Sequence, residues 1–146
     1  MTDLYQIADE TGIRIEYCRI PLNESLSVED EDGDIVLMDY SLMNASASER
    51  THLAHEIGHC IQGSFYNPYA TLDIRQKHEN RANRWAIQHL IPWDELNAVI
   101  SAGIAEVWEL AEWFDVSEDF MHKAIAYYTG PCGLSFQKIL PDGCQI

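Results

Sequence analysis

The segment from His55 to His59, His-Glu-Ile-Gly-His, constrains this chain more than any other part of the sequence. It lies in a stretch whose apolar spacing favours a helix, and two histidines four residues apart project from the same face of a helix. Their imidazoles can therefore reach one metal ion, and a glutamate beside that ion can accept a proton from water. The pattern predicts a metal-binding helix with His55 and His59 as ligands and Glu56 as general base.

The helix that carries this motif is expected over residues 46–62. Ser46 and Glu49 have the spacing of a capping box at its start, and Gly63 suits a left-handed ending. Gly58 in mid-helix costs about 1 kcal/mol relative to alanine, so we expect another part of the chain to approach the backbone there. The apolar spacing predicts a core face made of Leu53, Ile57, Cys60 and Ile61.

A catalytic zinc ion usually has three protein ligands and one open position. Glu79 lies in the next predicted helix, over residues 73–91, and Asn83 shares its face four residues later. Glu79 can bind the metal while the Asn83 carbonyl accepts a hydrogen bond from a ligand histidine and fixes its ring. The small residues Ala82 and Ala86 would let this helix lie close to the metal-binding helix.

Other assignments stay open at this point of the argument. Glu79 could instead be a surface residue in an ion pair with Arg75 or Arg81, because such pairs are common on helices. The third ligand would then be one of two histidines, His78 or His89.

Peptide hydrolysis also needs a donor to the developing oxyanion. Tyr66, Tyr69 and His78 are candidates from their positions, although packing is the ordinary role of a tyrosine. His52 lies about one turn before His55. We expect it to be a hydrogen-bonded neighbour of the site, because a fourth protein ligand would close the position that water needs.

The remaining patterns predict an α+β fold. A first helix ends at Gly12, and apolar alternation predicts strands over 13–20, 26–29 and 35–39, the last two joined by a tight turn at Asp32-Gly33. Further helices are expected over 94–101, 105–114 and 118–128. We expect one domain over residues 1–130 and an irregular tail over 131–146.

Composition limits the partners and the location. The formal net charge of −15 argues against general binding to nucleic acid or anionic membranes. No apolar run reaches the roughly 18 residues of a membrane span, and the acidic start does not resemble a signal peptide. We therefore expect a cytoplasmic protein with free thiols at Cys18, Cys60, Cys132 and Cys144. A pairing or metal role for Cys132 and Cys144 is the less favoured alternative, since no CxxC spacing supports it.

A second class of function competes with hydrolysis. Residues 109–117, followed by further apolar positions, resemble the core of a helix-turn-helix. The alternative is therefore a metal-containing DNA-binding protein, or one that sequesters a repressor without cutting it. Against DNA binding, the second helix would begin with Glu118 and Asp119 and offers only Lys123 as a cation. The cationic cluster Arg75, Lys77, Arg81 and Arg84 is interpreted as a solvated face.

Several motifs, taken in order, resemble the ImmA/IrrE family of small zinc metallopeptidases. The last two of them resemble the family elements E-x-x-A-N-x-(F/W)-A and L-(I/M)-P, and the likeness extends from the first helix to about Tyr128. The phage and mobile-element branch is the most similar in chain length and in its Arg-Trp-Ala…Leu-Ile-Pro variant. The matching segments are 53–59, 63–66, 79–86 and 89–92.

The resemblance implies a gluzincin-like site in which His55, His59 and Glu79 hold one zinc ion per chain and Glu56 is the base. It also implies a short twisted sheet packed on helices, with the metal-binding helix beside the sheet. Relatives of this kind are metalloendopeptidases that cleave a repressor or another regulator. The chain departs from the family at Arg81, where many relatives carry a second acid, and at Cys60, which would put an oxidisable thiol near the site.

Overall fold

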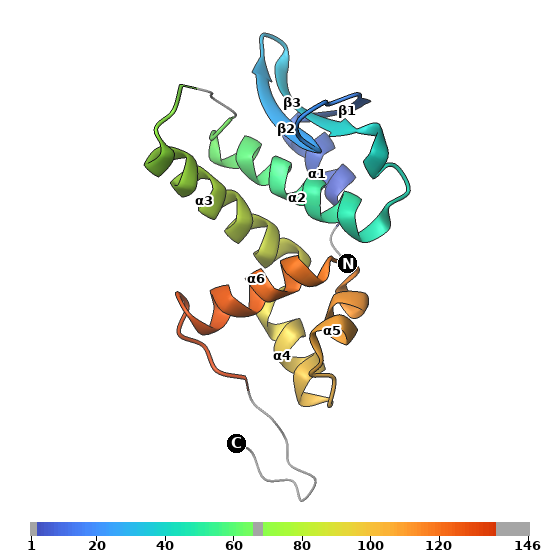
Figure 1. The fold of residues 1–146 in the computed structure, drawn as a ribbon, viewed down its shortest axis with the longest axis vertical. Coiled ribbons are helices and arrows are strands. Elements are labelled where there is room, and N and C mark those ends of the chain that lie inside the picture. Colours follow the sequence, from blue (N-terminus) through green and yellow to red (C-terminus); the bar gives the residue numbers. More distant parts are fainter. Residues whose placement is uncertain (1–2, 66–68, 137–146) are drawn as a thin grey trace, which may run out of the picture.

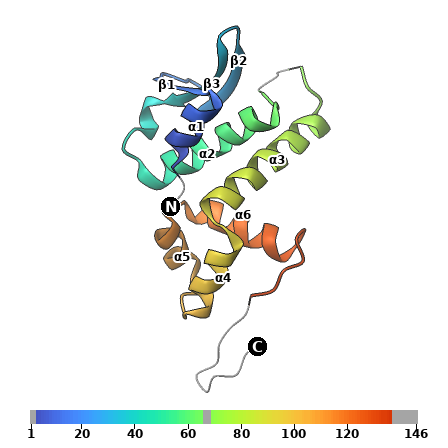
Figure 2. The ribbon, with the colours of Figure 1, turned by 180° about the vertical axis from the view of Figure 1, so that it is seen from behind.

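A computed structural model describes residues 3–65 and 69–136 and shows, within them, a three-stranded mixed sheet and six α-helices (Figure 1). The predicted α+β class is confirmed. The sheet and the helix beneath it lie at one end of the molecule, and the last three helices lie at the other (Figures 1 and 2). None of the described helices is long and apolar enough to cross a membrane.

The sheet has the strand order β1-β3-β2, so that β2 is an edge strand. Strands β2 (Ser25–Asp30) and β3 (Gly33–Asp39) form the predicted hairpin, and β1 (Arg14–Cys18) runs parallel to β3. Ser25 and Ser27 pair with Met38 and Val36, so these four side chains share one face of the sheet. All four are buried, because this face packs on the helix that carries the histidine motif.

Helix α2 (Ser46–Gln62) lies beneath the sheet and follows helix α1 (Leu4–Thr11) and a short 3-10 helix, Tyr40–Leu42. Helices α1 and α2 end at Gly12 and Gly63, both in the left-handed conformation predicted for a glycine ending. The predicted core face is only partly right. Leu53, Ile57 and Cys60 are buried, but Ile61, at the edge of that stripe, is 42% exposed.

The predicted capping box at the start of α2 is wrong. Ala45 occupies the cap position, so Ser46 already lies inside the first turn. The Ser46 hydroxyl instead donates to the carboxylate of Asp115, at 2.7 and 2.8 Å, and the Glu49 carboxylate accepts from the Tyr17 hydroxyl at 2.8 Å. Both side chains therefore tie α2 to other parts of the fold.

Helix α3 (Leu72–Leu90) packs along α2, and the two backbones come close together at Gly58. A Cβ atom at this glycine would lie 2.9 Å from the backbone oxygen of Ala82 and 3.2 Å from its Cα. Ala82 and Ala86 are fully buried. The expected close approach is thus confirmed, and it brings the polar face of α3 against the histidines of α2.

Three further helices complete the fold: α4 (Trp93–Ser101), α5 (Val107–Phe114) and α6 (Glu118–Thr129). Their bounds lie within two residues of those predicted. Helix α6 packs against α5 and α3, and the Tyr128 hydroxyl donates to the backbone oxygen of Ile91 at 2.7 Å. This hydrogen bond fixes α6 to the turn at the end of α3.

Candidate metal centre

Three side chains from two helices converge at one point. His55 and His59 come from α2, and Glu79 comes from α3. Glu79 Oε2 lies 2.9 Å from His55 Nε2, and Glu79 Oε1 lies 3.0 Å from His59 Nε2. The two Nε2 atoms are 3.1 Å apart. The structure thus brings together the three residues that the sequence singled out as ligands.

Hydrogen bonds orient both histidine rings. The Nδ1 atom of His55 lies 2.9 Å from the side-chain oxygen of Asn83, which can only accept a hydrogen bond, so Nδ1 carries the proton. The Nε2 atom of His55 therefore presents its lone pair to the convergence point in the neutral ring. On His59, Nδ1 lies 3.1 Å from the hydroxyl of Ser64, a buried residue just after Gly63. The two rings stand almost perpendicular, at 85°.

The donor set fits a divalent metal ion. Two imidazole nitrogens and a carboxylate are ligands that zinc accepts, and two ligands of a tetrahedral zinc ion lie about 3.3 Å apart, given bond lengths of about 2.0–2.1 Å. The observed separations of 2.9 to 3.1 Å between the donor atoms are close to that spacing. Three donors also leave room for a further ligand.

The charges of the cluster favour a cation. Hydrogen bonds from His55 and His59 hold the pKa of the Glu79 carboxyl well below its usual range. Burial of the His55 ring works against its charged form, but the hydrogen bond to Glu79 and the charge of Glu56 outweigh burial, so the pKa of His55 is raised. A positive charge is thus stabilised where the three side chains meet.

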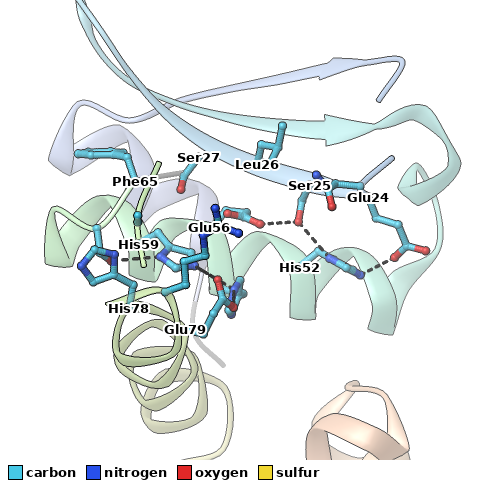
Figure 3. Close-up of a pocket in the computed structure, with 15 residues that line it drawn as sticks. Glu24, Ser25, Leu26, Ser27, His52, Glu56, His59, Phe65, His78 and Glu79 are labelled. Carbon is cyan, nitrogen blue, oxygen red and sulfur yellow. Dashed lines mark hydrogen bonds and ion pairs between the residues drawn. The ribbon is translucent and has the colours of Figure 1, made fainter. Parts of the chain in front are cut away.

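Glu56 lies beside this cluster in a cleft of about 400 Å³ bordered by β2, α2 and the start of α3 (Figure 3). Its side chain is buried, and its Oε2 atom accepts a hydrogen bond of 2.6 Å from the Ser25 hydroxyl. Within the described residues, Oε1 has no hydrogen-bond partner in the protein. One carboxylate oxygen is thus fixed, and the other is left to interact with molecules that enter the cleft.

The other predicted residues differ in where they lie. His78 lines the cleft and His52 borders it from the preceding turn of α2. Tyr69 is 93% exposed and is not among the residues that line the cleft, so the structure does not bring it to the site. Tyr66 lies outside the described residues.

The alternatives for Glu79 and for the third ligand find no support in the structure. Glu79 pairs with the two histidines of α2, not with a neighbouring arginine. His89 lies near the far end of α3, where its ring stacks on Trp85 with centroids 3.9 Å apart and Nδ1 donates to the backbone oxygen of Trp85. Its ring is therefore used in packing.

Sequence analysis missed three residues of the site: Glu24, Ser25 and Ser64. Ser25 and Glu24 reach the site only because β2 crosses above α2, and no local pattern carries that information. Ser64 had a weak signal, since it follows the glycine that ends the metal-binding helix and so lies close to His59 in the last turn.

The cysteines are confirmed as free thiols at the three positions described, Cys18, Cys60 and Cys132; Cys144 lies outside the described residues. The expectation of an oxidisable thiol at Cys60 is not supported. This side chain is buried in the core, and burial with the nearby charges of Asp34 and Glu56 raises the pKa of the thiol to about 12. The reactive thiolate is therefore scarce at neutral pH.

An HExxH helix packed under a short sheet, with a carboxylate from the next helix closing a metal-binding triad, defines a protein of the metallopeptidase class. The chain belongs to the family of the IrrE N-terminal-like domain, Peptidase_M78, whose model matches residues 8–126. This match confirms the resemblance to ImmA/IrrE proteins and covers every residue of the triad. No curated protein matches the chain significantly in sequence.

Proposed function

We propose that this chain is a zinc-dependent endopeptidase that hydrolyses a peptide bond in a specific protein substrate. The observation that carries the proposal is the convergence of His55, His59 and Glu79 beside Glu56, whose carboxylate has one oxygen fixed by a hydrogen bond. Family membership supports the same activity. His55, His59 and Glu79 would hold the metal, which when bound would polarise the substrate carbonyl and make water more acidic.

The protein's own groups supply the proton transfers and the orientation. Glu56 Oε1 accepts a proton from water in the cleft and later donates it to the leaving amine. Asn83 keeps the proton of His55 on Nδ1, so that Nε2 stays available as a ligand. His78 lines the cleft and is our candidate for the hydrogen-bond donor to the oxyanion.

The sheet supplies a place for an extended substrate. Strand β2 is at the edge of the sheet, and its start lines the cleft. Within the described residues no strand pairs with its outer edge, so its backbone groups can bind an extended peptide by adding a strand. Such binding recognises a segment of protein chain and leaves its sequence to be selected by side-chain contacts.

For the substrate we propose a repressor or another transcription regulator in the same cytoplasm, encoded by a phage or mobile element. The resemblance to the ImmA/IrrE branch with short chains supports this choice. A short, exposed segment between two domains of such a regulator would suit a narrow cleft, because it can adopt the extended conformation that β2 requires.

The test uses the whole protein loaded with zinc and a peptide library derived from a proteome, with cleavage products read by mass spectrometry. The wild type is expected to bind one zinc ion per chain and to cut a restricted set of bonds. Glu56→Gln is expected to keep the zinc and to lose cleavage. Glu112→Gln, an exposed change on α5, is the control and should match the wild type.

Two outcomes would contradict the proposal. Cleavage by zinc-loaded Glu56→Gln at the wild-type rate would remove Glu56 from the chemistry. A folded wild-type protein that binds no divalent metal would rule out the metal site. It would favour the alternative function, in which the protein sequesters a partner without cutting it.

A further inference from the structure

A chain of four polar side chains leads from the surface to Glu56 (Figure 3). Glu24 Oε2 lies 2.6 Å from His52 Nε2, His52 Nδ1 lies 3.1 Å from the Ser25 hydroxyl, and that hydroxyl donates to Glu56 Oε2 at 2.6 Å. Two members come from the start of β2 and its preceding residue, and two come from successive turns of α2. The chain thus joins the edge strand to the metal-binding helix.

The proton positions along the chain follow from its donors and acceptors. Ser25 has one hydroxyl proton and gives it to Glu56, so its oxygen can accept from His52 Nδ1 when that nitrogen carries a proton. The carboxylate of Glu24 can only accept, from His52 Nε2, so both hydrogen bonds of His52 are made together by the ring with a proton on each nitrogen. Each side chain therefore orients the one that it is hydrogen-bonded to, and Glu24 is the member at the surface.

Burial increases along the same path. The side chain of Glu24 is 60% exposed and that of His52 is 32% exposed, whereas Ser25 and Glu56 are buried. A hydrogen bond to a buried carboxylate is stronger than one at the surface, because water does not compete for it. The inner bond is also the shorter of the two that Ser25 makes.

We propose that Ser25, His52 and Glu24 are positioning residues for the general base. Ser25 holds Glu56 Oε2 against the sheet, which leaves Oε1 turned to the cleft. His52 acts through Ser25, because its donated hydrogen bond prevents the hydroxyl from rotating away from Glu56, and Glu24 holds the His52 ring. The proposal rests on the proposed peptidase function and goes beyond the metal ligands and the base.

The first experiment removes the Ser25 hydroxyl and compares the effect with a serine-to-alanine control outside the cleft. Ser25→Ala is expected to lower kcat roughly tenfold, the rate equivalent of a lost hydrogen bond to a charged group, with KM and zinc content unchanged. Ser48→Ala is the control. Ser48 lies on α2 and is not among the residues that line the cleft, so removal of its hydroxyl should leave kcat unchanged.

A double-mutant cycle tests whether His52 acts through Ser25. His52→Ala alone is expected to lower kcat, but His52→Ala combined with Ser25→Ala should be no slower than Ser25→Ala alone. Ser25→Thr keeps a hydroxyl and should retain more activity than Ser25→Ala. Independent losses that multiply in the double variant would overturn the proposed order of the chain.

A readout that needs no cleavage keeps this inference separate from the proposed function. The imidazole ¹⁵N signals of His52 report the protons on both ring nitrogens. They are expected to change in Ser25→Ala and in Glu24→Gln and to stay as in the wild type in Ser27→Ala, because the Ser27 hydroxyl has no hydrogen-bond partner among the described residues. Unchanged His52 signals in both of the first two variants would overturn the chain, whatever the activity. Changed signals in a protein that cuts no peptide would leave the chain intact and contradict the peptidase proposal.

Discussion

The two histidines of the metal centre are held at Nδ1 by different partners. His55 is held by the side-chain oxygen of Asn83 on the neighbouring helix, and His59 by the Ser64 hydroxyl just beyond its own helix. An amide oxygen accepts only, so it sets the tautomer, whereas a hydroxyl can donate or accept. We therefore assign control of ring orientation at the site mainly to Asn83.

This assignment predicts that Asn83→Ala weakens zinc affinity by about 10- to 100-fold, the usual effect of removing a partner of a ligand histidine. The matched control is Asn80→Ala. Asn80 is an exposed residue of the same helix whose side-chain oxygen accepts from Gln76. Competition with a zinc-binding dye would measure both affinities. Equal affinities for the two variants would show that Asn83 does not orient His55.

The buried thiol of Cys60 predicts how stability depends on alkaline pH. Its pKa is raised from an ordinary 9.0 to about 12, and that of Tyr128 from 10.0 to about 12, in both cases mainly by burial. Between pH 9 and 12 the unfolded chain loses these protons while the folded chain keeps them. The unfolded state then binds fewer protons, so the free energy of unfolding falls as pH rises.

Urea denaturation at pH 8 and at pH 10.5 would measure this fall. Cys60→Ala should reduce the slope with pH, although it also lowers stability at pH 8 by leaving a small cavity. A free energy of unfolding that does not change between the two pH values would contradict the raised pKa values.

Among the elements, the contact of α2 with α3 depends on a position without a side chain. Gly58→Ala would ordinarily gain about 1 kcal/mol in helix propensity. Here the added methyl group would meet the Ala82 backbone oxygen at 2.9 Å, so the helices must separate. We expect a net loss of about 2 kcal/mol in the free energy of unfolding and weaker zinc binding.

Chemical denaturation and zinc titration of Gly58→Ala would test this expectation. Ala82→Gly should not rescue the variant, because the clash is with the backbone of Ala82 and not with its side chain. A Gly58→Ala protein as stable as the wild type would mean that the helices have room to adjust.

The elements that local signals define were predicted well. The hairpin of β2 and β3, the glycine endings at Gly12 and Gly63, and the bounds of α2 follow from residues adjacent in sequence. The metal-binding triad could also be predicted, because helical spacing places His55 and His59 on one face of a helix and Glu79 on the same face as Asn83.

What could not be predicted depends on how distant segments meet. The parallel pairing of β1 with β3, the bond from Ser46 to Asp115 and the contact of Ser25 with Glu56 join residues far apart in the chain. The error at the start of α2 has the same origin. Ser46 and Glu49 match a local capping pattern, but tertiary partners compete for both side chains and bind them instead.

The distribution of charge over the whole molecule bears on the two classes of function that the sequence left open, hydrolysis and DNA binding. Helices α5 and α6, which cover the segment that resembles a helix-turn-helix in sequence, pack together, but the first turn of α6 carries Glu118 and Asp119. Four basic side chains gather on another surface. Lys77, Arg81 and Arg84 of α3, with Lys123 of α6, line an open groove of about 860 Å³ that also borders Glu79.

That distribution predicts no binding to duplex DNA at about 150 mM salt. Four cations can neutralise only a few phosphates, and the remainder of a protein with a net charge of −15 repels the duplex. Electrophoretic mobility shift at several salt concentrations would measure it, with the zinc-loaded protein in micromolar excess. Salt-dependent retardation that Lys77→Glu with Arg84→Glu abolishes would contradict the prediction and assign the groove to nucleic acid. Retardation that survives those changes would point to α6 and to a DNA-binding regulator, whereas its absence would agree with the proposed hydrolysis of a polypeptide in the cleft under β2.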